Sequence, residues 1–258
     1  MRRAVYTATF GSYDKVEPIS FESECDFYLF TDNERCKIAG WKTVFIEEID
    51  NLNLSNADLN RYLKINIPDE IKLYEQSLYI DGHVRVNSDP SFLFDKYLIN
   101  HDIAIPPHPL RRCIFDEAAY CSKTGLANKA EVSLQVKRYK EAGFPRNFGL
   151  TENGIILRNH SSIKVGLLMD EWWSEYKNGV KRDQISLPFV SWRINVNVGI
   201  IEEGPRYSST FFTLRPHVIR KMGIVKSVIW HIQAHQRRNN VYKFASKLVS
   251  WFESYVAK

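Results

Sequence analysis

The chain has 258 residues, 44% of them hydrophobic, which is enough to fill the core of one large domain or of one domain with an appendage. Its four cysteines lack the spacing of a metal motif or of a dense disulfide framework, so we expect them to be reduced. A strand pattern begins too close to Met1 for a cleavable signal, and no apolar run approaches the roughly 20 residues that span a bilayer. We therefore expect a cytoplasmic protein. The net charge of +5 is concentrated at the carboxyl end, with eight basic residues and one acid from residue 218 onward, whereas the preceding body has 27 basic and 29 acidic residues and so lacks a nucleic-acid footprint.

The first quarter of the chain has the pattern of three strands and a helix. Residues 4–10, 26–32 and 41–47 are strand-like, and residues 60–67 are helix-like, with Arg61 and Lys64 on one helix face. Asp32 ends the second strand and can accept hydrogen bonds from a base or ribose, while the two cations can neutralise phosphates. This arrangement predicts a nucleoside pocket at the edge of a sheet, although such a basic pair by itself is more often a solvated helix face.

The stretch from residue 77 to residue 86 is the centre of the prediction. Strand-type apolar residues lead into Asp81, Gly82 and His83, and a second apolar pair follows. In open α/β sheets, ligands bind beyond the carboxyl ends of the strands, so an Asp-Gly-His step there can hold a cation against a phosphate. Gly82 would let a diphosphate approach the backbone closely. The alternative interpretation is an ordinary Asp-Gly turn with an exposed histidine.

The middle of the chain alternates between strand and helix patterns. Residues 102–107 and 154–160 are strand-like, and residues 116–120, 129–142, 169–175 and 181–187 are helical. The alternation predicts an α/β fold with a mostly parallel central sheet flanked by helices. Trp172 and Trp173 could stack on a sugar ring, but such pairs are more often core, and Asp183 could simply cap a helix. The turn-rich loop 204–210 could close over a diphosphate and bring Arg215 and His217 to it.

The carboxyl-terminal segment is predicted to be a basic, amphipathic helical appendage. Its apolar residues recur at a helical spacing: Val241, Phe244, Leu248, Trp251, Phe252 and Tyr255. Such a helix suits docking on anionic lipid or a partner, but packing against the body with a solvated basic face explains the pattern equally well. We expect residues 1–217 to form the main domain and residues 218–258 the appendage.

Eight short motifs occur in one order: Phe-Gly-x-Tyr-Asp (residues 10–14), Phe-Thr-Asp (30–32), Arg-x-x-Lys (61–64), Tyr-Ile-Asp-Gly-His (79–83), His-x-x-Arg-Arg-Cys (108–113), Trp-Trp-x-Glu (172–175), Arg-Asp-Gln-Ile-Ser (182–186) and Arg-Pro-His (215–217). With these motifs, roughly residues 4–217 resemble the family catalogued as domain of unknown function 616, which is described as glycosyltransferase-like. That family resembles the GT-A fold of nucleotide-sugar-dependent glycosyltransferases.

The resemblance implies a role for each matching residue. Asp81 and His83 stand at the Asp-x-Asp signature that binds a divalent cation and the donor, and His217 resembles the late histidine of the metal site. Asp183 and Gln184, the predicted catalytic residues, resemble the Asp-Gln pair of retaining enzymes. The predicted donor-binding residues are Thr7, Phe10, Gly11, Tyr13, Asp32, Arg61, Lys64, Asp81, Gly82 and Arg215. The predicted acceptor-binding residues are His108, Arg112, Trp172 and Trp173, and the predicted metal ligands are Asp81, His83 and His217.

The histidine at position 83 replaces the usual carboxylate. Imidazole suits Mn²⁺, Zn²⁺ or Fe²⁺ better than Mg²⁺, so we expect Mn²⁺ first. A metal-independent version, in which Arg and Lys alone hold the diphosphate, is the alternative.

The sequence therefore predicts a glycosyltransferase that moves a sugar from a nucleoside-diphosphate donor, UDP-sugar first, to a glycan or lipid-linked acceptor in surface polysaccharide synthesis. A carboxylate beside an amide favours retention, and Asp183 as a base would serve inversion. The chain would be cytoplasmic or peripheral at the inner membrane face. The alternatives are a metal-dependent hydrolase or phosphodiesterase, a nucleotidyltransferase, for which a Gly-rich phosphate loop is missing, and a lipid- or nucleic-acid-binding protein acting through the tail.

Overall fold

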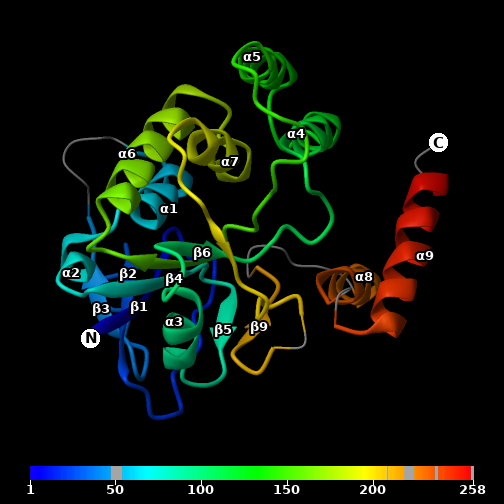
Figure 1. Cartoon of the computed structure of the whole chain (residues 1–258). Helices are drawn as coiled ribbons and strands as arrows, with labels where there is room; N and C mark the ends of the chain where they lie inside the picture. The colour runs from blue at the N-terminus through cyan, green and yellow to red at the C-terminus, as the bar shows by residue number, and fades with distance from the viewer. Residues whose placement is uncertain (48–53, 208, 218–223, 236–237, 257–258) are drawn as a thin grey trace.

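The computed structural model describes residues 1–47, 54–207, 209–217, 224–235 and 238–256 (Figure 1). In these residues a seven-stranded sheet has the order β3-β2-β1-β4-β7-β6-β8. Its strands are β1 (Arg3–Thr9), β2 (Cys25–Thr31), β3 (Lys42–Phe45), β4 (Gln76–Ile80), β6 (Ile103–Ile105), β7 (Ile155–Asn159) and β8 (Gly199–Ile200). A separate pair joins β5 (Val84–Val86) to β9 (Phe212–Leu214) in antiparallel fashion.

The predicted mostly parallel sheet is confirmed, with one exception in direction. β1 is parallel to both β2 and β4, β2 to β3, and β6 to β8, whereas β7 is antiparallel to β4 and β6. The chain builds β2 and β3 on one side of β1 and then places β4 on the other side. The loops that leave β1 and β4 therefore diverge around a crevice at the carboxyl ends of these strands, which is where ligands bind in such sheets.

Both faces of the sheet are buried because the strands are apolar on both sides. Tyr6 and Tyr79 point into one core, which is covered by helices, whereas Val5 and Leu78, their neighbours along the strands, point into the other. The period of two in a strand explains this division.

Helices cover the two faces unequally (Figure 1). The first core includes residues of α1 (Asn56–Ile65), α2 (Asp69–Lys72), α4 (Ile114–Lys123), α5 (Lys129–Glu141), α6 (Ile163–Asn178) and α7 (Asp183–Arg193). The second core includes residues of α3 (Ser91–Tyr97) and of the β5–β9 pair.

Helix α1 is held at both of its ends. Ser55 caps its first turn by accepting a hydrogen bond from the backbone N–H of Asp58, as a serine before a helix commonly does. At the other end, Arg158 of β7 is fully buried and its Nη1 donates to the carbonyls of Lys64 (2.9 Å) and Ile65 (3.1 Å). The helix that carries Arg61 and Lys64 is therefore fixed to the central sheet.

The carboxyl-terminal segment forms two helices, α8 (Ile224–Ala234) and α9 (Asn240–Val256), where one amphipathic stripe was expected. Trp230 and Ala234 of α8 pack against the second core, and α9 lies outside α8 (Figure 1). Among the described side chains of α9, three expected apolar residues are exposed: Val241, Phe244 and Leu248.

Part of the predicted stripe lies outside this description. The side chains of Trp251, Phe252 and Tyr255 fall outside the described residues, as do Arg220, Lys221, Arg237 and Lys258. Within the described ranges, none of the helices combines the length and the hydropathy that crossing a bilayer requires. The four cysteines Cys25, Cys36, Cys113 and Cys121 are free thiols in the structure.

Candidate active site

Two adjoining cavities open at the carboxyl ends of β1 and β4. The larger one, the β1 cavity, has a volume of about 480 Å³ and is lined by the loop after β1 and the start of α1. The smaller one, the α7 cavity, has a volume of about 230 Å³ and is lined by the start of α7 and by segments 152–155 and 205–206. Both are lined by Arg61, Asp81, His83, Arg182 and His217.

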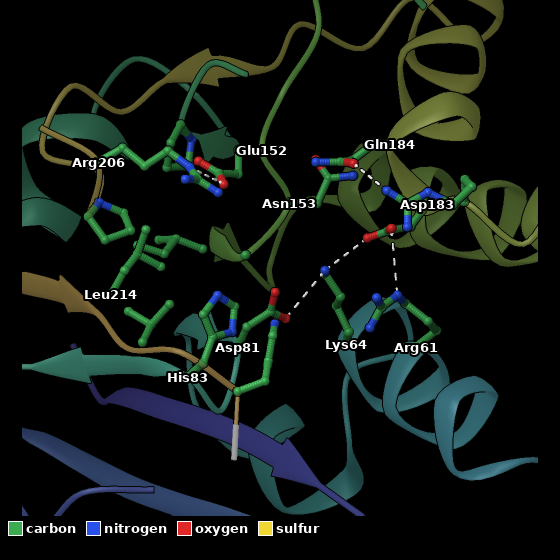
Figure 2. Close-up of a pocket in the computed structure, with 17 residues that line it drawn as sticks. Arg61, Lys64, Asp81, His83, Glu152, Asn153, Asp183, Gln184, Arg206 and Leu214 are labelled. Atoms are coloured by element: carbon green, nitrogen blue, oxygen red, sulfur yellow. Dashed lines mark hydrogen bonds and ion pairs between the residues drawn. The ribbon is translucent and has the colours of Figure 1, made fainter. Parts of the chain in front are cut away.

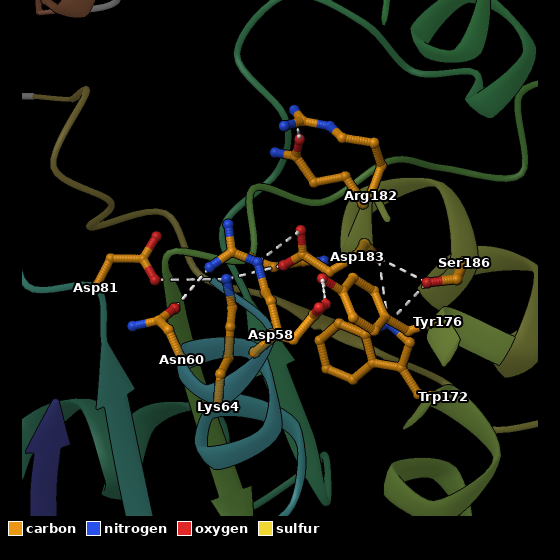
Figure 3. A network of polar contacts seen from close by, with 12 residues as sticks. Asp58, Asn60, Lys64, Asp81, Trp172, Tyr176, Arg182, Asp183 and Ser186 are labelled. Atoms are coloured by element: carbon orange, nitrogen blue, oxygen red, sulfur yellow. Dashed lines mark hydrogen bonds and ion pairs between the residues drawn. The ribbon is translucent and has the colours of Figure 1, made fainter. Parts of the chain in front are cut away.

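A buried chain of opposite charges crosses the floor of the α7 cavity (Figures 2 and 3). Lys64, whose side chain is only 2% exposed, has its Nζ 2.8 Å from Asp183 Oδ2 and 3.4 Å from Asp81 Oδ1. Arg61 Nε lies 3.6 Å from Asp183 Oδ1. The sequence prediction that Arg61 and Lys64 face one crevice is thus supported by their contacts, because both meet the same carboxylate.

These cations keep the two acids ionised. Burial alone raises the pKa of Asp183, but Lys64 and Arg61 outweigh it and hold that pKa far below its usual range. The pKa of Asp81 is lowered in the same way, with burial opposed by the same two cations. At neutral pH the site therefore presents two ionised carboxylates, with the ammonium of Lys64 between them (Figure 2).

The tryptophans predicted to contact an acceptor instead belong to the core. Trp172 is fully buried and Trp173 is 8% exposed, and neither lines the β1 cavity or the α7 cavity. Trp172 Nε1 lies 3.2 Å from the carbonyl oxygen of Asp183 and 3.1 Å from Ser186 Oγ, so it anchors the first turn of α7 (Figure 3). Burial contradicts stacking on a sugar, and Trp172 positions Asp183 through its backbone.

A candidate metal site lies where the two cavities adjoin. Asp14, His83 and His217 each offer one ligand atom, and these atoms lie within 4.8 Å of one another. His217 Nδ1 is 2.6 Å from Asp14 Oδ1, and the Nδ1 atom of His83 is buried without a hydrogen-bond partner. Burial lowers the pKa of His83 to about 4, so its imidazole is neutral and able to coordinate.

The group shares two residues with the predicted ligands and differs from them at the third. Asp81 is outside the group, and its Oδ1 contacts Lys64 and the hydroxyl of Tyr79, the latter at 2.9 Å. Asp14 is the third member of the group, and it can approach because Gly82 has no side chain: a Cβ there would lie 3.0 Å from the Cβ of Asp14. Two imidazoles and a carboxylate fit Mn²⁺, Zn²⁺ or Fe²⁺.

The loop after β1 forms a wall of the β1 cavity. Three residues that were predicted to bind the donor, Phe10, Gly11 and Tyr13, line this cavity. Gly11 has a φ of +61°, which glycine adopts without strain, and its N–H donates to Asp32 Oδ2 at 2.7 Å. Asp32 therefore holds this loop and does not itself line the cavity. Thr7, predicted to bind donor, is fully buried in β1 and lines neither cavity.

Three further predicted residues lie away from both cavities. Arg215 is exposed and its Nη1 lies 3.6 Å from Glu17 Oε1. His108 is buried, and its Nδ1 accepts hydrogen bonds from the backbone of Leu110 and Arg111. Arg112 is exposed and lines neither cavity. The predicted roles of Arg215 in donor binding and of His108 and Arg112 in acceptor binding are therefore not supported.

Several cavity residues were missed from the sequence. These are Asp14, Asn60, Glu152, Asn153, Arg182 and Arg206. Asp14 and Arg182 stand inside two of the motifs quoted above, which was the available signal. Asn60, Glu152, Asn153 and Arg206 line the cavities because segments that are distant in the sequence come together in the fold, and no local pattern marks them.

Unsatisfied polar atoms gather in the α7 cavity. Seven buried side-chain atoms in the described residues have no hydrogen-bond partner, and four belong to residues lining this cavity: His83 Nδ1, Asn153 Nδ2, Arg182 Nε and Asp183 Oδ2, the last being ion-paired with Lys64. Native proteins leave few such atoms, so their clustering indicates a site built for a polar ligand.

The sequence profile of the TOD1/MUCI70 glycosyltransferase-like domain matches residues 29–203. The chain therefore belongs to this family. The match supports the expected glycosyltransferase-like character, although it does not carry the label domain of unknown function 616. A search of curated proteins finds no significant match to the chain.

Among solved structures, the apo form of the bifunctional glycosyltransferase WbbM has a TM-score of 0.47 and 14% identity, covering 92% of this chain and 45% of its own. Mouse xyloside xylosyltransferase 1 has a TM-score of 0.45 and 12% identity, covering 93% and 95%. The galactosyltransferase LgtC, in complex with donor and acceptor sugar analogs, has a TM-score of 0.41 and 14% identity, covering 79% and 74%. This chain thus spans less than half of WbbM. These likenesses are distant, and the α/β fold assignment rests on the sheet and helices described above.

Proposed function

We propose that this chain is a GT-A-like glycosyltransferase that moves a sugar from a nucleoside-diphosphate donor, UDP-sugar first, to a glycan or lipid-linked acceptor. One observation carries the proposal: two cavities of different chemistry meet at Arg61, Asp81, His83, Arg182 and His217. The β1 cavity suits a nucleoside, because its wall combines an aromatic side chain, Phe10, with a glycine loop. The α7 cavity, with its carboxylates and amides, suits a sugar.

The junction between the cavities would receive the diphosphate. Arg61 and Arg182 would neutralise its charge, and the unsatisfied Nε of Arg182 supplies a free donor. Asp14, His83 and His217 would hold a divalent cation, which stabilises the charge that develops on a departing diphosphate.

Asp183 would act on the sugar as a carboxylate. Its lowered pKa makes it a poor proton acceptor, so it suits stabilisation of an oxocarbenium-like state or orientation of a hydroxyl better than general-base chemistry. Gln184, which also lines the α7 cavity, would supply an amide beside it. This combination favours retention.

A thermal-shift panel tests the donor. UDP-, GDP- and ADP-sugars, each with and without Mn²⁺, should include one that raises the melting temperature, because a ligand that binds only the folded state stabilises it. Release of free sugar at a productive rate without any acceptor would favour the hydrolase alternative. A panel in which no nucleotide or nucleotide sugar shifts the melting temperature would overturn the proposal.

We also propose that the protein works in the cytoplasm, at the inner membrane face, on an acceptor used in surface polysaccharide synthesis. The support is α9, where exposed apolar residues stand beside exposed basic ones. Val241, Phe244 and Leu248 share one side of the helix, and Lys243 and Lys247 flank them. This combination suits an anionic lipid surface.

A further inference from the structure

Away from its junction with the β1 cavity, the α7 cavity is lined by charged side chains that cancel one another. Apart from the residues that the two cavities share, its charged lining residues are Lys64, Glu152, Asp183 and Arg206. These are two cations and two acids. The excess of positive charge lies at the junction, where Arg61 and Arg182 stand against Asp81, and the rest of the cavity is polar without excess charge.

Each of the two cations is already paired with an acid. Lys64 is paired with Asp183, as described above, and Arg206 Nε donates to Glu152 Oε1 at 2.6 Å. The two pairs lie on opposite sides of the cavity in Figure 2. The Glu152–Arg206 pair is well shielded, with side-chain exposures of 18% and 24%. Because the Nε of Arg206 is engaged with Glu152, the pair presents no uncompensated positive charge to a second carboxylate.

The remaining polar groups suit hydroxyls. Asn153 is 1% exposed, its Oδ1 accepts from Thr151 at 2.6 Å, and its Nδ2 donor is left without a partner. Gln184 supplies a second amide to the lining. Amides and paired carboxylates exchange hydrogen bonds with neutral hydroxyl groups without needing a charged ligand.

We propose that the α7 cavity accepts an uncharged sugar and that the Glu152–Arg206 pair excludes a hexuronic acid from it. This inference rests on the proposed function and names the class of sugar for that site. A uronate carboxylate entering the cavity would have to compete with Glu152 for Arg206, and it would lose its water without gaining an unpaired cation on this side of the cavity. The exclusion should therefore be at least about tenfold in affinity.

A test follows from removing one charge. UDP-glucose and UDP-glucuronate differ only at carbon 6 of the sugar, and their affinities are measured by calorimetry with Mn²⁺ and without acceptor. The wild-type chain should bind UDP-glucose at least about tenfold more tightly. In Glu152→Gln, Arg206 is released to bind the carboxylate as a fork, so the ratio of the two affinities should fall about tenfold or more.

Two further variants make the assignment specific. Arg206→Gln removes the cation, so it should keep the preference for UDP-glucose, and the double variant with Glu152→Gln should lose the gain in uronate affinity. Glu203→Gln is the matched control. Glu203 pairs with Lys96 at a similar exposure of 21% but lines neither cavity, so this change should leave the ratio unaltered.

The outcomes separate this inference from the function on which it rests. If UDP and both sugars bind but Glu152→Gln leaves the ratio as in the wild type, or if the wild type prefers the uronate, the specificity inference is wrong and the transferase proposal stands. If Glu152→Gln abolishes transfer with an unchanged binding ratio, Glu152 acts in the reaction and not in selection, which also overturns the inference. If neither UDP nor any nucleotide sugar binds, both fall together.

Discussion

Asp183 is a buried carboxylate placed against two cations that belong to one helix. Arg61 and Lys64 are one helical turn apart on α1, and both reach Asp183 at the start of α7. The arrangement fixes the charge of the carboxylate and also its direction, because its backbone carbonyl is held by Trp172. A charge fixed in this way can stabilise a cationic transition state without reorganising during the reaction.

Replacement of Asp183 by asparagine should therefore remove activity while the fold persists. We expect sugar transfer to fall by at least about 100-fold, as when one preorganised electrostatic group is lost. Initial rates and circular dichroism measure the two effects. Asp116→Asn, which changes an exposed acid paired with Arg146, is the control and should keep the wild-type rate. Full activity in a folded Asp183→Asn variant would remove Asp183 from the mechanism.

His160 gives the protein a predictable response to acid. Its Nδ1 lies 2.7 Å from the carbonyl of Tyr74 and its Nε2 lies 2.7 Å from Ser77 Oγ. Burial lowers its pKa to about 4, below the ordinary value near 6.5 that the unfolded chain would have. Between these values the unfolded state binds the proton first, so the free energy of unfolding should fall as the pH falls from about 6.5 towards 4.

Urea titrations at pH 7 and pH 5 measure this effect. In His160→Gln the loss of stability between the two pH values should be smaller than in the wild type. His231→Gln, at an exposed position of α8, should behave like the wild type. An equal loss in wild type and His160→Gln would show that His160 does not carry the acid response.

At the scale of elements, the sequence predicted what short-range patterns can specify. The strands at the amino end, the buried β4 that leads into Asp81, and the helix bearing Arg61 and Lys64 follow from apolar runs and helical spacing. The antiparallel direction of β7 could not be predicted, because strand direction depends on how the chain returns to the sheet and leaves no local periodicity.

The candidate site was predictable only in part, for a related reason. Asp81, His83, Asp183 and His217 stand in short motifs, whereas the ion pair of Glu152 with Arg206 joins residues 54 positions apart and is decided by folding. Trp172 illustrates the opposite case, a residue that the sequence assigned to the site although it belongs to the core. Its ring could stack on a sugar, but it is fully buried and cannot contact one.

Helix α9 leads to a prediction about membranes. If its exposed face docks on anionic lipid, the triple change Val241→Ser, Phe244→Ser and Leu248→Ser should weaken binding to phosphatidylglycerol vesicles by more than about tenfold, because three apolar side chains no longer leave water. Cosedimentation measures this. Leu134→Ser alters a single exposed leucine of α5 and should have no effect. Equal binding by the wild type and the triple variant would exclude the docking role.

At the scale of the whole molecule, the candidate metal site brings together residues from distant parts of the chain. Asp14 follows β1, His83 lies between β4 and β5, and His217 follows β9. An ion bound by all three would link the central sheet, the β5–β9 pair and the amino-terminal loop. Its binding energy would therefore add to the stability of the entire fold.

Manganese should accordingly raise the melting temperature. We expect an increase of roughly 5 °C or more at a Mn²⁺ concentration about 100 times the dissociation constant. Asp14→Asn should reduce this shift, whereas Asp69→Asn, at an exposed acid paired with Lys72, should keep it. Differential scanning calorimetry with and without a chelator distinguishes these outcomes, and a full shift in Asp14→Asn would remove Asp14 from the ligands.

The guanidinium of Arg158 has a consequence for how substrate preference can change. By binding the last carbonyls of α1 from within the sheet, it makes the wall with Arg61 and Lys64 a permanent part of the scaffold, ready before any donor arrives. The opposite wall, with Glu152 and Arg206, comes from connecting segments that tolerate substitution more readily. When related proteins evolve to use other sugars, we therefore expect the substitutions to fall in the segments that carry Glu152 and Arg206. The residues of α1 that act in the reaction should stay the same.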